Sequence, residues 1–186
     1  MSNKVIAVVG LAGSGKTEAI EYLVKATNLP KIYFGDATIE GVKKLGLEVN
    51  EANERKVREE LRAKYGMAAY ALANLEKIKK LYKESSVFIE SLYSWEEYET
   101  IKEEFGDNFT VLAIFASTNT RITRLSDRKI RPLTAEELLS RDKSQIENLH
   151  QAGPIAKADW TIINESDIKT LHANLDEYIK NNTNTK

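Results

Sequence analysis

The segment Gly10–Thr17 has the residue pattern with the clearest chemistry. It reads GLAGSGKT and matches the phosphate-binding pattern G-x-x-x-x-G-K-[ST]. Glycines at these positions let the backbone curl so that successive N–H groups point at phosphate oxygens, and a helix that begins near Lys16 adds the positive end of its dipole. We expect Lys16 to reach the β- and γ-phosphates of ATP and the Thr17 hydroxyl to ligate Mg²⁺. The residues predicted to bind the nucleotide here are Gly10, Ala12, Gly13, Ser14, Gly15, Lys16, Thr17 and Glu18.

A second segment, Arg121–Arg131, concentrates positive charge. It reads RITRLSDRKIR, with four arginines and one lysine against one aspartate. Phosphoryl transfer spreads negative charge over the migrating group, and fixed cations stabilise that charge. Small-molecule kinases carry such cations on a lid that closes over ATP and excludes water. We interpret residues 121–141, which end at Arg141, as this lid; a solvated basic face is the alternative.

The remaining motifs narrow the class of nucleotide-binding protein. The chain has no guanine-reading N-K-x-D segment, which argues against a GTPase, and no apolar strand that ends in Asp-Glu, as motor proteins have. The nearest feature is Val87–Glu90, a short apolar run with one terminal acid. Glu90 is therefore a candidate to hold Mg²⁺ through water or to orient a substrate, and a polar residue at a strand end is the alternative interpretation.

Composition excludes several other classes of function. The 186 residues have the size of one domain, and we treat 1–186 as a single unit. A net charge of −1 does not support a nucleic-acid binder, and the absence of cysteine excludes disulfides and thiol chemistry. The chain has neither a membrane-spanning apolar run nor a secretory signal pattern, so we predict a cytoplasmic monomer or homodimer without a membrane partner.

Short apolar runs alternate with helical patterns along the whole chain. Strands are predicted at Val5–Val9, Lys31–Phe34, Val87–Ile89, Thr110–Phe115 and Trp160–Ile163. Helices are predicted at Thr17–Ala26, from Gly35-Asp36 to about Leu45, and at Glu51–Tyr65, Met67–Tyr82 and Asp167–Ile179. Strands separated by helices of this length indicate parallel βαβ units, hence a three-layer α/β/α fold.

These motifs, in this order, resemble the nucleoside-monophosphate-kinase-like P-loop kinases, and most of all the small adenylate-kinase-related or dephospho-CoA-kinase-like proteins. The resemblance rests on GLAGSGKT, FGDATIEGVKKLGLE at Phe34–Glu48, VFIES at Val87–Ser91, S-R-D at Ser140–Asp142 and ADWTIINES at Ala158–Ser166. It implies a five-stranded parallel sheet of order 2-3-1-4-5. It also implies an acceptor-binding helical region at about residues 36–82 and a mobile lid after the fourth strand.

The same resemblance implies roles for particular side chains. Arg121 or Arg124 would lie near the adenine and phosphates of ATP, and Asn164 would approach the adenine edge. The residues implied as clamps on the transferring phosphoryl group are Arg128, Arg131 and Arg141.

Two departures from the family pattern concern the phosphoryl acceptor. Relatives commonly carry an arginine three residues after the aspartate of Gly-Asp, where this chain has Ile39, and another after the third strand, where it has Tyr93. In relatives these two arginines would bind an acceptor phosphate. Their absence makes an AMP-like acceptor less favoured for this chain. A hydroxyl acceptor needs a carboxylate base instead, and Asp36 is the candidate, with a helix N-cap as its alternative role. Tyr93, Trp95 and Tyr98 either line an acceptor pocket or belong to the core.

The sequence thus favours an ATP- and Mg²⁺-dependent small-molecule kinase that transfers the γ-phosphoryl group to a nucleotide or coenzyme-like acceptor. A dephospho-CoA-like hydroxyl and a nucleoside monophosphate remain rival acceptors. The alternative function is a non-catalytic regulator that binds ATP or another adenine nucleotide on a kinase fold.

Overall fold

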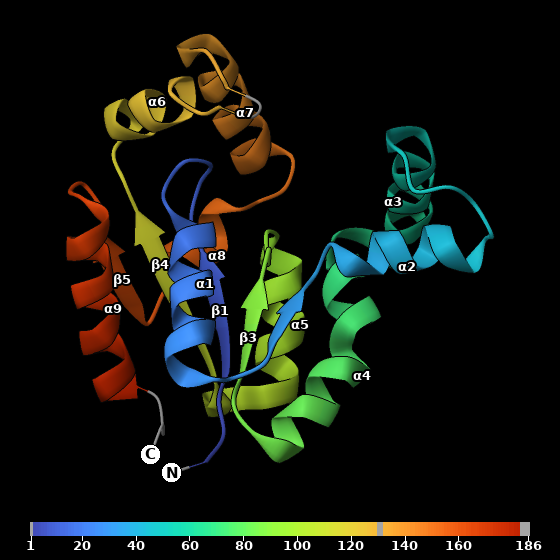
Figure 1. Ribbon diagram of the computed structural model, residues 1–186. Coiled ribbons are helices and arrows are strands. Elements are labelled where there is room, and N and C mark those ends of the chain that lie inside the picture. The colour runs from blue at the N-terminus through green and yellow to red at the C-terminus, as the bar shows by residue number, and fades with distance from the viewer. Residues whose placement is uncertain (1, 130–131, 183–186) are drawn as a thin grey trace.

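The core of the protein is a single sheet of parallel strands (Figure 1). The computed structural model describes residues 2–129 and 132–182. The strands are β1 (Val5–Val9), β2 (Lys31–Tyr33), β3 (Val87–Glu90), β4 (Phe109–Phe115) and β5 (Trp160–Ile163). They form a five-stranded sheet in the order β2-β3-β1-β4-β5, with all four neighbouring pairs parallel. The predicted fold class and strand order are confirmed.

The apolar character of β1 follows from its central place in the sheet. Val5, Ala7 and Val9 belong to the core on one face, and Ile6 and Val8 belong to the core on the other. Because alternate residues of a strand point to opposite faces, a strand covered on both sides must be apolar throughout.

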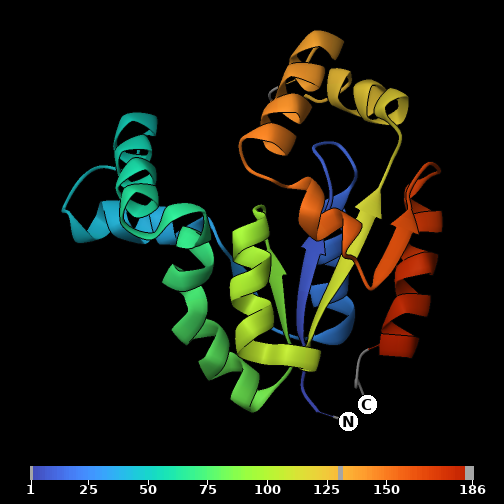
Figure 2. The ribbon, with the colours of Figure 1, turned by 180° about the vertical axis from the view of Figure 1, so that it is seen from behind.

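Helices cover both faces of the sheet. On one face lie α1 (Lys16–Thr27) and α9 (Ile168–Asn182), whose buried residues include Leu23 and Leu175. On the other lie α4 (Ala69–Glu84), α5 (Trp95–Phe105) and α8 (Ala152–Ala156), which contribute Ile78 and Ile101 to the core. The layers are therefore helix, sheet and helix (Figures 1 and 2).

Two helical pairs extend beyond the carboxyl ends of the strands. One, which we call the helical arm, consists of α2 (Asp36–Lys44) and α3 (Glu51–Tyr65) and follows β2. The other consists of α6 (Thr118–Ser126) and α7 (Ala135–Glu147) and follows β4. Figures 1 and 2 show the two pairs on different sides of the loop between β1 and α1. Loops that follow parallel strands meet at one edge of the sheet, where α/β proteins bind ligands.

The predicted element boundaries differ from the observed ones by only a few residues. The largest change is at the last helix, which was predicted to end at Ile179 and ends at Asn182. The helix predicted at Met67–Tyr82 starts at Ala69, after a short 3-10 turn at Gly66–Ala68. Gly66, the C-cap of α3, has a φ of +64°, a left-handed conformation that ends this helix.

Candidate functional site

The loop Gly10–Gly15 joins β1 to α1 and has the curled backbone that its glycines predict. Gly10 and Gly15 have φ angles of +146° and +100°. A Cβ atom at Gly10 would lie 2.3 Å from the Ile114 carbonyl oxygen, and one at Gly15 would lie 2.4 Å from Asn164 Nδ2. Both positions therefore require glycine for backbone conformation and for space.

Three side chains from other elements hold the carbonyl groups of this loop. Gln151 Nε2 donates to the Gly10 carbonyl at 3.0 Å, and Asn164 Nδ2 donates to the Ser14 carbonyl at 2.9 Å. Both side chains are buried. The third, from Arg121, donates to the Ala12 carbonyl at 3.1 Å. The loop conformation is thus fixed from outside, which preorganises it for a ligand.

Arg121 is buried and uses its whole guanidinium on protein acceptors. Nη1 and Nη2 donate to the two carboxylate oxygens of Asp142 at 2.9 and 2.6 Å. Nε donates to the Ala116 carbonyl at 3.2 Å, and Nη2 also donates to Thr118 Oγ1 at 3.4 Å. With the bond to the P-loop, all five N–H groups have acceptors. The geometry gives Arg121 a structural role, and its contact with a nucleotide stays a prediction.

Lys16 lies half-buried in a pocket of about 190 Å³ above the loop, which we call the P-loop pocket. Its ammonium donates to the Leu11 carbonyl at 2.9 Å. Burial lowers the pKa of Lys16 to about 8; the charges of Arg141 and Arg121 act in the same direction, and the Glu90 carboxylate opposes them. An ammonium with this pKa gains strongly from an anion placed beside it.

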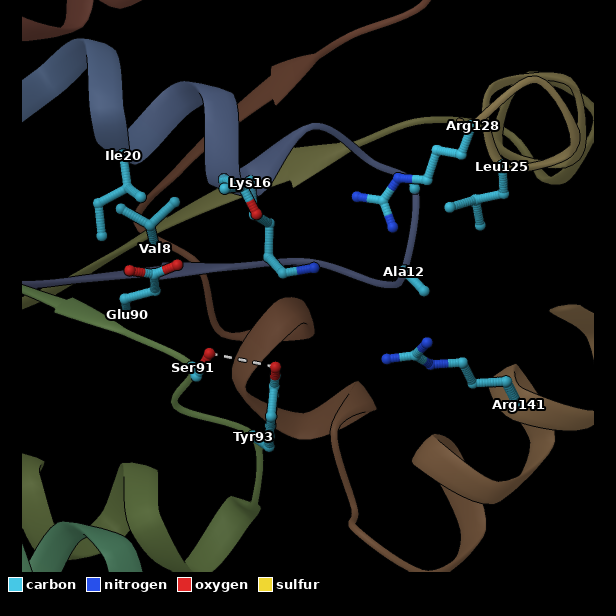
Figure 3. A pocket seen from close by; sticks show the side chains of 12 residues that line it. Val8, Ala12, Lys16, Ile20, Glu90, Ser91, Tyr93, Leu125, Arg128 and Arg141 are labelled. Carbon is cyan, nitrogen blue, oxygen red and sulfur yellow. Dashed lines mark hydrogen bonds between the residues drawn. The ribbon is translucent and has the colours of Figure 1, made fainter. Parts of the chain in front are cut away.

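Several of the predicted site residues meet in the P-loop pocket. They are Lys16, Thr17, Glu90, Arg128 and Arg141. Figure 3 shows Lys16, Arg128 and Arg141 pointing into one space, from the start of α1, the loop after α6, and α7. Three cations against one carboxylate leave this pocket net positive, which fits a polyphosphate.

The oxygens of Thr17 and Glu90 fit Mg²⁺, which needs only one or two protein ligands when phosphates and waters supply the rest. Glu90 also pairs with Lys31 at 2.7 Å. In the described part of the chain, no group of three or more His, Cys, Asp or Glu side chains forms an all-protein metal cage.

The predicted adenine side forms a separate pocket of about 270 Å³. It brings Glu18, Arg124 and Asn164 together beside Gly15. Arg124 Nη2 donates to the Ser166 carbonyl at 3.0 Å and to Asn164 Oδ1 at 3.4 Å, while its buried Nη1 has no acceptor among the described residues.

One predicted site residue, Asp36, lies away from the others. Asp36 is exposed as the first residue of α2. It lines neither the P-loop pocket nor a further pocket, described below, that borders the helical arm. Gly35 is the N-cap, without a side-chain cap bond, so the alternative role of Asp36 as N-cap is wrong. Its role as a base stays a prediction. Arg131 lies outside the described residues.

A third pocket, the arm pocket, lies between the helical arm and α7 and has a volume of about 380 Å³. It shares Ser91, Tyr93 and Arg141 with the P-loop pocket, so the two pockets adjoin. Its other lining residues include aromatic side chains and two arginines: Tyr33, Phe34, Tyr70, Arg58 and Arg62. Of the three aromatics considered in the sequence, Tyr93 lines this pocket, while Trp95 stacks on Tyr98 with ring centroids 4.9 Å apart.

Arg58 and Arg62 were missed by the sequence reasoning. The available signal was their spacing of four residues in a predicted helix, which puts both on one face. From the sequence, the segment Glu51–Tyr65 is predicted only as a helix rich in charged residues. Only the packing of α3 shows that this face borders a pocket.

Comparison with known proteins identifies the family. Residues 6–148 match a family model described as AAA domain. The chain is 32% identical over 175 residues to a UPF0200 protein of Methanoculleus marisnigri, which covers 92% of this chain and 93% of the relative. The chain belongs to the UPF0200 family of AAA-domain proteins. A UPF0200/UPF0201 protein of Archaeoglobus fulgidus is 36% identical over 164 residues; the match covers 87% of this chain but spans only 50% of that relative.

Solved structures place the UPF0200 chain among P-loop kinase folds. A shikimate kinase from Bacteroides thetaiotaomicron matches with a TM-score of 0.60 at 13% identity, over 95% of this chain and 97% of that one. A gluconokinase from Sinorhizobium meliloti 1021 matches with a TM-score of 0.55 at 17% identity, over 96% and 94%. At these identities the likeness shows the fold alone, and it confirms the resemblance to P-loop kinases. None of the described helices has the length and apolar character to cross a bilayer.

Proposed function

We propose that this UPF0200 protein is an ATP- and Mg²⁺-dependent small-molecule kinase with a nucleotide or coenzyme-like acceptor. The observation that carries the proposal is the meeting of Lys16, Arg128 and Arg141 in a pocket that adjoins a second, arginine-bearing pocket. A site for a polyphosphate donor beside a site for another molecule is what phosphoryl transfer requires. The two structural neighbours described above are a shikimate kinase and a gluconokinase.

The donor side of the proposal follows from charge. Lys16, Arg128 and Arg141 would stabilise the negative charge that spreads over the γ-phosphoryl group during transfer. An acceptor oxygen forms a bond to the γ-phosphorus while the bond from that phosphorus to the β,γ-bridging oxygen breaks, and ADP leaves. Thr17 and Glu90 are the residues that would hold Mg²⁺, which supplies further positive charge to the phosphates.

The acceptor side has two candidates. A hydroxyl acceptor must give its proton to a base, for which Asp36 is our candidate, whereas an ionised phosphate acceptor needs no base. Each carboxylate that lines the P-loop and arm pockets already has a cationic partner, Glu90 with Lys31 and Glu54 with Arg58. This pairing favours the phosphate acceptor. It also keeps open the second candidate function, a non-catalytic regulator that binds an adenine nucleotide.

An acceptor screen tests the proposal. The protein is incubated with ATP and Mg²⁺ and with nucleoside monophosphates, nucleosides or dephospho-CoA, and ADP formation is followed. We expect one acceptor class to accelerate ADP formation, and Lys16→Ala to reduce the accelerated rate by about 100-fold or more. ATP binding without acceleration by any acceptor would instead support the regulator, and full activity in Lys16→Ala would overturn the mechanism.

A further inference from the structure

The side chains that line the arm pocket carry more positive than negative charge. Its charged side chains are Arg58, Arg62 and Arg141 against the single carboxylate of Glu54. Glu54 pairs with Arg58 at 3.4 Å. Among the described residues, Arg62 and Arg141 have no ion-pair partner within 4 Å, and the charge of Arg62 acts at longer range on the Glu97 carboxyl group, whose pKa burial raises and this charge lowers in part. Cations gathered around a pocket with aromatic walls favour an anionic ligand.

The uncharged part of this pocket indicates what else the ligand carries. Tyr33, Tyr70 and Tyr93 supply flat apolar surface, which suits a planar ring. Gln145 from α7 also lines the pocket and is 8% exposed, and its buried Oε1 has no donor within the described part of the chain. Since a buried carbonyl without a donor is costly, a ligand N–H or O–H group would complete this site.

The two arginines of α3 differ from Arg141 in position. Arg58 and Arg62 are four residues apart and share one face of α3, which stands beside α2 in the helical arm (Figure 1). Arg141 lines both pockets and so lies between the arm and the P-loop. An anion held by the pair would therefore anchor the end of the pocket that is formed by the arm.

We propose that Arg58 and Arg62 form the anion-binding end of the acceptor pocket and select planar acceptors that carry a phosphate group. The inference rests on the proposed function and names the acceptor class and the residues that recognise it. Two guanidinium groups on one helix face bind a phosphate dianion through paired, charge-assisted hydrogen bonds. Relatives carry arginines at the positions of Ile39 and Tyr93, and this chain does not. Arg58 and Arg62 on α3 would take over that role, so the missing arginines no longer argue against a phosphate-bearing acceptor.

Equilibrium binding tests this assignment without relying on turnover. The P-loop side is first saturated with a non-hydrolysable ATP analogue and Mg²⁺. AMP, CMP, GMP and UMP, each with its matching nucleoside, and dephospho-CoA are then titrated by calorimetry. We expect a phosphorylated probe to bind at least about 10-fold more tightly than its nucleoside, and Arg58→Ala/Arg62→Ala to weaken that binding by about 100-fold.

Arg55→Ala is the matched control. Arg55 is on the same helix, is exposed, pairs with Glu59 at 3.0 Å and does not line the pocket. Its loss should change probe affinity by less than about 3-fold. Glu54→Gln should act in the opposite direction and tighten binding, because it removes the negative charge beside Arg58. Affinity for the ATP analogue should stay at the wild-type value in all of these variants.

Three results would overturn the inference while the donor side stands. They are equal affinity of the double variant and Arg55→Ala for the probes, equal affinity of nucleosides and nucleotides, and binding of none of the probes to wild-type protein that holds the analogue. Failure of the wild-type protein to bind the ATP analogue would instead refute the proposed function, and this inference with it.

Discussion

The buried guanidinium of Arg121 binds both carboxylate oxygens of Asp142, at 2.9 and 2.6 Å. The two residues lie on α6 and α7, and Arg121 also holds the Ala12 carbonyl of the P-loop. Each charge offsets the other away from water. Through these contacts, the pair connects both helices of the predicted lid to the phosphate loop.

Asp142→Asn should therefore destabilise the protein. Removing one charge of a buried pair leaves the other uncompensated, and we expect the free energy of unfolding to fall by about 3 kcal/mol. Urea denaturation measures the change. The exposed pair Asp107–Lys102, with atoms 3.6 Å apart, provides a control, and Asp107→Asn should stay close to wild type. Equal stability of the two variants would contradict the prediction, and the apolar double variant Arg121→Met/Asp142→Leu should recover part of the loss.

Nucleotide affinity should fall as pH rises through about 8. The pKa of Lys16 is lowered to about 8 by burial and neighbouring arginines, so above that pH the free protein holds Lys16 largely neutral. Bound phosphate favours the ammonium, so binding must take up a proton, and affinity should decrease by up to about 10-fold per pH unit. Calorimetry from pH 7 to 9.5 measures this slope. Lys16→Arg stays charged, so an equally steep slope in that variant would refute the assignment.

Glu97 should make stability depend on pH between about 4.5 and 7. Burial raises the pKa of Glu97 to about 7, although its carboxylate accepts from the Tyr93 and Ser94 N–H groups at 2.8 and 3.1 Å. In this window the folded protein holds a proton that the unfolded chain has lost. The free energy of unfolding therefore falls as pH rises, by about 3 kcal/mol in total, and levels off above pH 7.

The matched variant is Glu97→Gln, which keeps the capping box with Ser94 but does not titrate. Urea denaturation at several pH values between 4.5 and 8 should show a flatter profile for this variant than for wild type. Parallel profiles would show that Glu97 does not contribute the predicted pH dependence.

Most of the fold could be predicted from the sequence because its signals are local. The apolar run Val5–Val9 predicts a central strand whatever the rest of the chain does, and the helix predicted at Glu51–Tyr65 is observed with the same bounds. Where prediction failed, a neighbour changed the local outcome. Asp36 does not cap α2, because Gly35 occupies the cap position in a helical conformation.

The roles of individual arginines were harder to predict. Arg121 looked like one cation of a basic run, and its partner Asp142 is 21 residues away in the chain. Arg58 and Arg62 belong to a segment that the sequence predicts only as a charged helix. Whether a guanidinium is used by the protein or faces a pocket depends on which side chains packing brings to it, and neither composition nor spacing contains that information.

The sequence by itself determined the nucleotide end of this protein. A phosphate loop is built from consecutive residues, so its glycines, Lys16 and Thr17 can be recognised in one short segment of the sequence. Only the tertiary structure decided the other end. The arm pocket takes Tyr33 from β2, Arg58 from α3, Tyr70 from α4 and Gln145 from α7, and their approach depends on how these elements pack against one another.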